Sequence, residues 1–330
     1  MPDCLISLGG NLGDRGETLR DAARQIAALD GVQSIRSSRL YATPAIGGPP
    51  DQPPFLNAAV RITTEIPASE LLPRLQQLEH DAGRVRQQRW SARPIDLDII
   101  LYGDLIGDRR FLSVPHPRYT ARKFVLMPAA EVAGDMVDPR FGWSIASLAA
   151  SLADAVPSAV LVGGSRSLRQ TLLRSVAGSD VDIWTGGPAN AGGDRSIQLP
   201  DQPPPQPWLL DADQVVAAAA GSKPHWSTRP RLWMRLMSQP SEPTLSPIDT
   251  ASIATAMDVG HYAGRSDWFD RPTDQQPWPS PHQIWNRGRS QPEYGLEFKD
   301  VIWAGQEIAS ALRSMNCDCQ PAGALLPANP

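Results

Sequence analysis

The sequence predicts an α+β domain in its first half and a second, α/β domain with long proline-rich loops in its second half. In the first half, short apolar segments alternate with longer segments of helical periodicity. The composition then changes near Val156–Pro157: eight of the ten tryptophans and 20 of the 33 prolines lie after residue 150. Because two such different compositions rarely share one core, we predict domains at residues 1–156 and 157–330.

Each element of the first half follows from its own pattern. Strands are predicted where apolar residues run together or alternate, and helices where they recur at three- and four-residue spacing, with turn residues such as Gly31 ending them. In order, these are strand Leu5–Leu8, helix Leu19–Ala27, strands Val32–Tyr41 and Phe55–Thr64, helix Ser69–Asp81, strand Ile95–Leu101, and helices Met127–Val132 and Ile145–Ala155.

The second half is less regular. We predict strands at Val160–Val162 and Val181–Trp184, and helices at Leu168–Val176, Asp211–Ala220 and Glu297–Met315. Residues 186–207 have the composition of a loop. Cys317 and Cys319 are expected in a frayed tail, since one such pair is a weak signal for a metal site.

Composition excludes several classes of function. No run of about 18 apolar residues exists, and the N-terminus lacks the basic and apolar regions of a secretory signal. Three cysteines provide no disulfide framework. The net charge of −4, all of it from the second half, argues against non-specific nucleic-acid binding. We therefore expect a cytoplasmic protein with neither a nucleic-acid nor a membrane partner.

The strongest chemical signal is a carboxylate pair that follows an arginine-rich segment. Residues alternate faces along a strand, so Asp96 and Asp98 share one face while Leu97 and Ile99 point to the other. Two carboxylates suit Mg²⁺, and the arginines of residues 84–93 suit phosphate oxygens. This combination indicates a nucleotide-dependent phosphoryl-transfer site. The alternative is an exposed strand edge beside a solvated loop.

Two weaker features accompany this pair. Thr43-Pro44, Phe55 and Asn57 combine an aromatic ring with a side chain that both donates and accepts, which suits the edge of a heterocycle. His116 lies in a short basic segment, although an isolated histidine is more often structural than catalytic.

In order along the chain, the segments that carry chemistry are Ile6-Ser7-Leu8-Gly9-Gly10-Asn11-Leu12-Gly13-Asp14, Tyr41-Ala42-Thr43-Pro44, Gln52-Pro53-Pro54-Phe55-Leu56-Asn57-Ala58-Ala59, Glu79 with Gly83-Arg84, Arg89-Trp90 with Arg93 and Asp96-Leu97-Asp98, and Val114-Pro115-His116-Pro117-Arg118 with Arg122 and Phe124. Together they resemble the 6-hydroxymethyl-7,8-dihydropterin pyrophosphokinases of the folate pathway. The resemblance runs from about Cys4 to Leu148, and residues 157–330 match no family that we recognise.

The resemblance implies a ferredoxin-like α/β sandwich that transfers pyrophosphate from ATP to the pterin hydroxymethyl group. It implies that Asp96 and Asp98 bind two Mg²⁺ ions and that Arg84 and Arg93 act with them on the phosphates. The remaining implied ATP-binding residues are Gln76, Glu79, Arg86, Trp90, Ile99, His116 and Arg122. The implied pterin-binding residues are Thr43, Pro44, Ile46, Phe55, Asn57 and Phe124.

The sequence departs from the family pattern at two places. Gly10 replaces a usual serine, which we expect a turn to accept, and Ser91-Ala92 replaces a usual Gly-Pro, which we expect to alter the stiffness of the arginine-rich loop. Two alternatives to the enzyme therefore remain. The first half is a catalytically weak pterin- or nucleotide-binding module, or the chain is a scaffold whose C-terminal half recruits a folate-pathway protein.

Overall fold

The computed structural model describes residues 1–84, 90–109, 112–153, 156–177, 182–185, 204–212, 231–237, 291–297 and 300–327. Contacts divide the chain into two compact units. The first unit combines Met1–Pro139, Trp143–Ser151 and Cys317–Pro330, and the second combines Arg140–Gly142 with Leu152–Asn316. The division near residue 152 lies close to the change in composition, but the last residues of the chain join the first unit.

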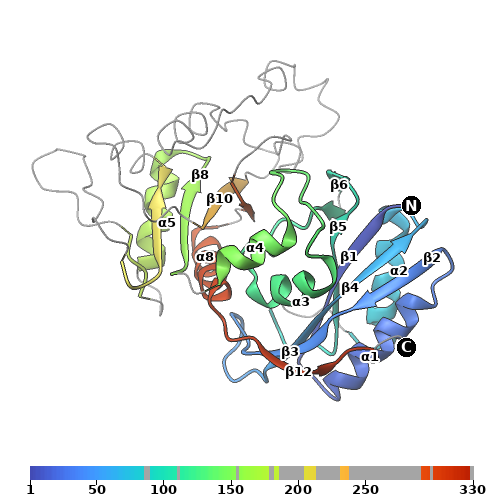
Figure 1. Cartoon of the computed structure of the whole chain (residues 1–330). Helices are drawn as coiled ribbons and strands as arrows, with labels where there is room; N and C mark the ends of the chain where they lie inside the picture. The colour runs from blue at the N-terminus through green and yellow to red at the C-terminus, as the bar shows by residue number, and fades with distance from the viewer. Residues whose placement is uncertain are drawn as a thin grey trace, which may run out of the picture. The chain divides into compact units, whose positions relative to one another are not determined.

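The first unit is built on a six-stranded sheet in which β12, β3, β4, β1 and β5 lie in that order and β2 also pairs with β4 (Figure 1). All of these pairs are antiparallel. The strands are β1 (Asp3–Gly10), β2 (Val32–Ser37), β3 (Arg39–Thr43), β4 (Phe55–Thr64), β5 (Asp96–Tyr102) and β12 (Gln320–Ala324). The mixed α+β class predicted from the sequence is therefore confirmed.

Helices cover both faces of this sheet. Alternation along β1 directs Ile6 and Leu8 into a core cluster with α1 (Arg15–Ala27) and α2 (Ala68–Asp81). The opposite face carries Leu5 and Ser7 and contacts α3 (Lys123–Ala133). Two helices thus pack on one face, and α3 packs on the other.

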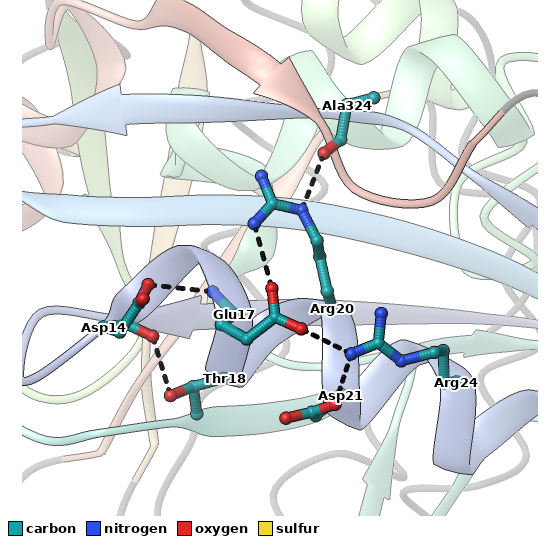
Figure 2. A network of polar contacts seen from close by, with 7 residues as sticks. All are labelled: Asp14, Glu17, Thr18, Arg20, Asp21, Arg24 and Ala324. Carbon is teal, nitrogen blue, oxygen red and sulfur yellow. Dashed lines mark hydrogen bonds and ion pairs between the residues drawn. The ribbon is translucent and has the colours of Figure 1, made fainter.

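Helix α1 begins with a side-chain cap and carries a network of ion pairs along its surface (Figure 2). Asp14 Oδ1 accepts from the Glu17 backbone N–H at 3.1 Å, which satisfies one free amide of the first turn. Arg20 lies 3.4 Å from Glu17 and also donates from Nε to the carbonyl of Ala324 at 3.4 Å. The first helix of the chain therefore contacts its last strand.

The second unit is described only in part and contains a four-stranded parallel sheet of order β11-β10-β8-β9. Its elements are β8 (Ser158–Val162), α5 (Arg166–Ala177), β9 (Trp208–Asp211), β10 (Leu232–Met237), β11 (Glu293–Glu297) and α8 (Val301–Met315). Two buried ion pairs, Arg169–Asp211 and Arg235–Glu293, connect elements of this unit.

The remaining elements of the described residues are β6 (Gly107–Arg109), β7 (Leu112–Val114), a 3₁₀ turn η1 (Tyr119–Ala121) and α4 (Ile145–Leu152). Within the described residues, no helix is long and apolar enough to cross a membrane.

Several predicted elements need correction. The strand expected at Val32–Tyr41 is two strands, which separate at Ser38, where the hydroxyl accepts from the Ala59 backbone N–H. The helix expected from Met127 begins earlier, at Lys123. The closing helix was expected from Glu297, but Glu297 is the last residue of β11 and the helix begins at Val301.

In the second unit, Trp184 forms only an isolated bridge with Trp208, so the strand expected there is wrong for its described residues. A helix was expected at Asp211–Ala220, but Asp211 is the last residue of β9. Residues 213–220 of that expected helix lie outside the described residues. The prediction that Cys317 and Cys319 lie in a frayed tail was also wrong, because β12, which follows them directly, pairs with β3.

Candidate active site

The candidate site lies on the α3 face of the first sheet, where polar residues of three strands are in register with one another. Asp96 of β5 pairs with Gly9 of β1, Gly9 pairs with Asn57 of β4, and Asn57 pairs with Tyr41 of β3. Residues in register on neighbouring strands project from the same face. Asp98, two residues from Asp96, shares that face, as the sequence predicted.

Glycine at the end of β1 permits this close packing. A Cβ atom on Gly9 would lie 2.8 Å from Asn57 Oδ1, and one on Gly10 would lie 2.2 Å from the carbonyl oxygen of Pro94. Gly10 is therefore a point of close backbone approach that glycine fits, and it lies at the end of β1, not in a turn.

Arginines hold the first carboxylate of the pair. Asp96 lies 2.5 Å from Arg84 and 2.7 Å from Arg93, and Arg84 also pairs with Glu79. The Nε–H of Arg93 is buried and has no hydrogen-bond partner among the described residues. A buried donor of this kind is costly unless a ligand accepts from it, and a phosphate oxygen is a suitable acceptor.

The two carboxylates have opposite pKa shifts. Burial raises the pKa of Asp98 to about 6, and the neighbouring Asp96 charge adds to this effect. Burial also raises the pKa of Asp96, but the guanidinium groups of Arg93 and Arg84 outweigh it, so that the pKa is lowered. The pair thus holds one compensated and one poorly compensated negative charge, a donor set that suits a divalent cation.

Aromatic and amide groups lie on the same face as the carboxylates. Phe55 and Asn57 are two positions apart on β4 and therefore share one face. Asn57 donates from Nδ2 to Thr43 Oγ1 at 2.8 Å. The Arg93 guanidinium lies 5.4 Å from the Phe55 ring centroid, and that of Arg122 lies 5.9 Å from the Phe124 centroid. Both rings are half-buried and so retain exposed surface.

The other predicted residues occupy varied environments. Glu79 is 3% exposed and accepts from the Leu97 backbone N–H at 2.7 Å, which places it under β5. Ile99 is buried in the core, so only its backbone is available to a ligand. His116 Nδ1 accepts from the Arg118 backbone N–H at 3.1 Å. Gln76, Ile46 and Trp90 are half-buried, Pro44 is exposed, and Arg86 lies outside the described residues.

Asn11 is a candidate site residue that sequence reasoning did not include. It is 1% exposed, its backbone N–H donates to the Arg93 carbonyl at 2.9 Å, and its Oδ1 accepts from the Arg93 N–H at 2.8 Å. Its Nδ2 donates to the carbonyl of Pro53 at 3.2 Å. The available signal was an asparagine directly after two glycines, in a segment that carries the family resemblance.

These groups suit a phosphorylated ligand and a flat ring. Comparisons with known proteins identify the family of this part of the chain. The family model of 7,8-dihydro-6-hydroxymethylpterin-pyrophosphokinase (HPPK) matches residues 5–134. The 2-amino-4-hydroxy-6-hydroxymethyldihydropteridine pyrophosphokinase of Haemophilus influenzae is 40% identical over 139 residues, which is 42% of this chain and 86% of that protein. The Synechocystis protein of the same name is 39% identical over 144 residues, 44% of this chain and 73% of that protein.

The chain therefore belongs to the HPPK family through its N-terminal part. Among solved structures, an HPPK-DHPS of Plasmodium falciparum aligns with 72% of this chain and 68% of its own at 10% identity. The TM-score of this alignment is 0.36.

Proposed function

We propose that the first unit is an ATP-dependent pyrophosphokinase of folate biosynthesis, which converts 6-hydroxymethyl-7,8-dihydropterin and ATP into the pterin diphosphate and AMP. The observation that carries the proposal is that Asp96, Asp98, Phe55 and Asn57 share one face of the sheet, next to Arg93. Phosphate-binding and ring-binding groups therefore occupy one site. Family membership supplies the reaction.

The ring-binding residues would hold the pterin by its faces and its polar edge. Phe55 and Phe124 would stack on the ring, and Asn57 would meet its heteroatoms with one donor and one acceptor. The hydrogen bond that Asn57 donates to Thr43 fixes the orientation of its side-chain amide. Thr43, Pro44 and Ile46 complete this side of the proposed pocket.

The charged residues would bind ATP. Asp96 and Asp98 would hold Mg²⁺, with phosphate oxygens and water as its further ligands, and two such ions fit the family's chemistry. Held by Asp96 and Asp98, the metal would supply positive charge that offsets the charge of the phosphates. Arg84 and Arg93 would leave Asp96 and bind the triphosphate, and Arg122 and His116 would assist them. Arg86, outside the described residues, stays an expected ATP contact. Gln76, Trp90 and the backbone of Ile99 would line the nucleotide side.

In the reaction, the pterin hydroxyl oxygen forms a bond to the β-phosphorus of ATP. The bond from that phosphorus to the oxygen bridging the α-phosphate breaks, AMP leaves, and the hydroxyl proton is lost. Arginines fixed around the transferred group stabilise its charge in the transition state. Asn11 ties the backbone of Arg93 to residue 53, so it would bring the arginine-rich loop and the loop at residues 44–54 together and exclude water.

The test is AMP formation from ATP and the reduced hydroxymethyl pterin in the presence of Mg²⁺. We expect AMP in an amount that depends on the pterin. Calorimetric binding of pterin without AMP release would favour the alternative of a binding module. A protein partner for residues 157–330 remains a prediction, which co-purification with the full chain tests.

A further inference from the structure

Glu131 of α3 is the centre of a cluster of hydrogen bonds with β3. Its Oε1 accepts from the Tyr41 hydroxyl at 2.6 Å and from Arg39 Nε at 2.7 Å. Its Oε2 accepts from the backbone N–H of Arg39 at 2.8 Å. Both carboxylate oxygens therefore bind β3, and one of these bonds holds the strand backbone itself.

The cluster is charged, and its tyrosine is buried. Tyr41 is 3% exposed, and burial together with the hydrogen bond to Glu131 raises its pKa to about 12, so the hydroxyl remains a donor at neutral pH. Burial also raises the pKa of Glu131, but hydrogen bonds from Arg39 and Tyr41 outweigh burial and lower that pKa. Because hydrogen bonds to a charged acceptor are stronger than neutral ones, the Tyr41–Glu131 bond is a strong connection between strand and helix.

Tyr41 belongs to the row of paired residues that crosses the candidate site. It pairs with Asn57 of β4, and Thr43, two residues along β3, lies on the same face. Thr43 Oγ1 accepts from Asn57 Nδ2 at 2.8 Å. The strand that Glu131 holds therefore carries the hydroxyl that orients the Asn57 amide.

Glu131 also lies on the helix that carries a proposed ring contact. Phe124 is seven residues, about two helical turns, before Glu131, so the two side chains project from the same side of α3. The helix contacts both β3 and β4 (Figure 1). One carboxylate thus joins the helix of Phe124 to the strand of Thr43.

The ATP side of the candidate site lies at the opposite end of the row. Four paired residues cross β5, β1, β4 and β3 in the order Asp96, Gly9, Asn57 and Tyr41. Three strand spacings of about 4.8 Å each therefore separate Tyr41 from Asp96. A change at Glu131 should affect the pterin side of the site before the ATP side.

We infer that Glu131 is a positioning residue for the proposed pterin pocket, which acts through Tyr41 to fix β3 and thereby the hydrogen bond between Thr43 and Asn57. The inference rests on the proposed function, because Thr43 and Asn57 are proposed pterin contacts. The alternative is a cluster that only stabilises the fold, and it predicts no preference for one substrate over the other.

The same unit contains a matched ion pair away from the pocket. Arg61 of β4 lies 2.6 Å from Asp135, two residues after the end of α3. Arg61 is four residues from Asn57 along the strand, a distance of about 13 Å. Asp135→Asn therefore weakens a contact between the sheet and the end of this helix and leaves the Glu131 cluster intact.

The test measures AMP formation by the full-length wild-type protein and its variants as a function of pterin and of ATP. We expect Tyr41→Phe, which removes one hydroxyl, to raise the KM for pterin about three- to tenfold, with kcat and the KM for ATP changed less than about twofold. Glu131→Ala should raise the KM for pterin further. Glu131→Gln keeps one acceptor and should lie between Glu131→Ala and the wild type, whereas Asp135→Asn should equal the wild type in both KM values.

The side-chain NH₂ signals of Asn57, in protein labelled with ¹⁵N-asparagine, provide an NMR readout that is independent of catalysis. They should shift in Tyr41→Phe and Glu131→Ala and stay unchanged in Asp135→Asn. Equal increases in both KM values, an equal effect of Asp135→Asn, or unshifted Asn57 signals would overturn the inference.

Two further outcomes have a defined meaning. If Glu131→Ala does not fold, Tyr41→Phe decides the inference, because it removes a single oxygen atom. If the wild-type protein forms no AMP, the proposed function fails, and the Asn57 signals with pterin binding measured by calorimetry still decide the role of Glu131.

Discussion

Asp98 is the residue at which stability and function oppose each other most clearly. Its raised pKa means that the folded protein holds the proton more tightly than the unfolded chain. This contribution favours folding fully below the ordinary carboxyl pKa and is lost as the pH rises through about 6. In metal-free protein at neutral pH, the carboxylate is therefore a source of instability that a bound cation would relieve.

We predict that Asp98→Asn abolishes AMP formation and raises the free energy of unfolding of metal-free protein at pH 7 by about 1 to 3 kcal/mol, since one pKa unit corresponds to about 1.4 kcal/mol. Denaturant titrations between pH 4 and pH 7 would measure this. The difference between variant and wild type should increase with pH across that interval. A difference that is constant with pH, or retained turnover, would contradict the assignment.

A second prediction concerns Asn11, which contacts Arg93 and Pro53. Asn11→Ala should lower kcat about 10- to 100-fold, because Arg93 would no longer be held in place, and small misplacements cost rate more than affinity. Asn11→Asp retains the acceptor for the Arg93 N–H, but it loses the donor to Pro53 and Gln52 and adds a buried negative charge, so its kcat should also lie below the wild-type value. Steady-state kinetics with unchanged kcat in both variants would show that the two loops are positioned by other contacts.

At the scale of elements, the sequence predicted the strands and helices whose patterns are local. β4, α2 and β5 lie within a few residues of their predicted bounds, because alternation and helical spacing directly reflect burial. The face shared by Asp96 and Asp98 followed from the same rule. Gly10 and Asn11 could not be assigned in this way, because their roles depend on the backbone of Pro94 and Arg93, more than 80 positions away.

β12 was missed for a similar reason. Its five residues, Gln-Pro-Ala-Gly-Ala, have low strand propensity and are exposed, and they form a strand only because the free edge of β3 is available. Leu325, directly after the strand, supplies the apolar contact that keeps it there.

We therefore predict that Leu325→Ala lowers the free energy of unfolding of the first unit by about 2 to 5 kcal/mol, the usual cost of removing a buried leucine side chain. Leu105→Ala is the matched control: Leu105 belongs to the same unit but is 40% exposed, and its replacement should cost much less. Thermal or denaturant unfolding followed by Tyr and Trp fluorescence measures both. Equal effects of the two substitutions would contradict an integral tail.

At the scale of the whole molecule, the first unit is discontinuous in sequence. Its last strand is separated from the rest by residues 152–316, which form the second unit. Composition located the change between the two units but could not show that the chain returns, because the returning segment is short and has no strand periodicity. We propose that the pyrophosphokinase domain, predicted at residues 1–156, ends at about residue 151 and is completed by the tail, Cys317–Pro330, and that residues 152–316 form most of the separate domain.

A fragment of residues 1–156 should then be less stable than the same unit in the full chain, because it lacks β12 and Leu325. A synthetic peptide of residues 317–327 added to the fragment should raise its midpoint of unfolding, since a ligand that binds only the folded state stabilises it. A peptide with Leu325→Ala is the control and should have a smaller effect. A fragment as stable as the full-length unit, and indifferent to the peptide, would show that the tail is dispensable.

The most direct test of the central claim is to follow the phosphorus atoms of ATP by ³¹P NMR while the purified full chain acts on the reduced hydroxymethyl pterin with Mg²⁺. A site that transfers pyrophosphate in one step predicts equal amounts of AMP and a pterin diphosphate, with no ADP at any time. Accumulation of ADP with a pterin monophosphate, or an unchanged ATP spectrum from folded protein that binds the pterin, would contradict the account.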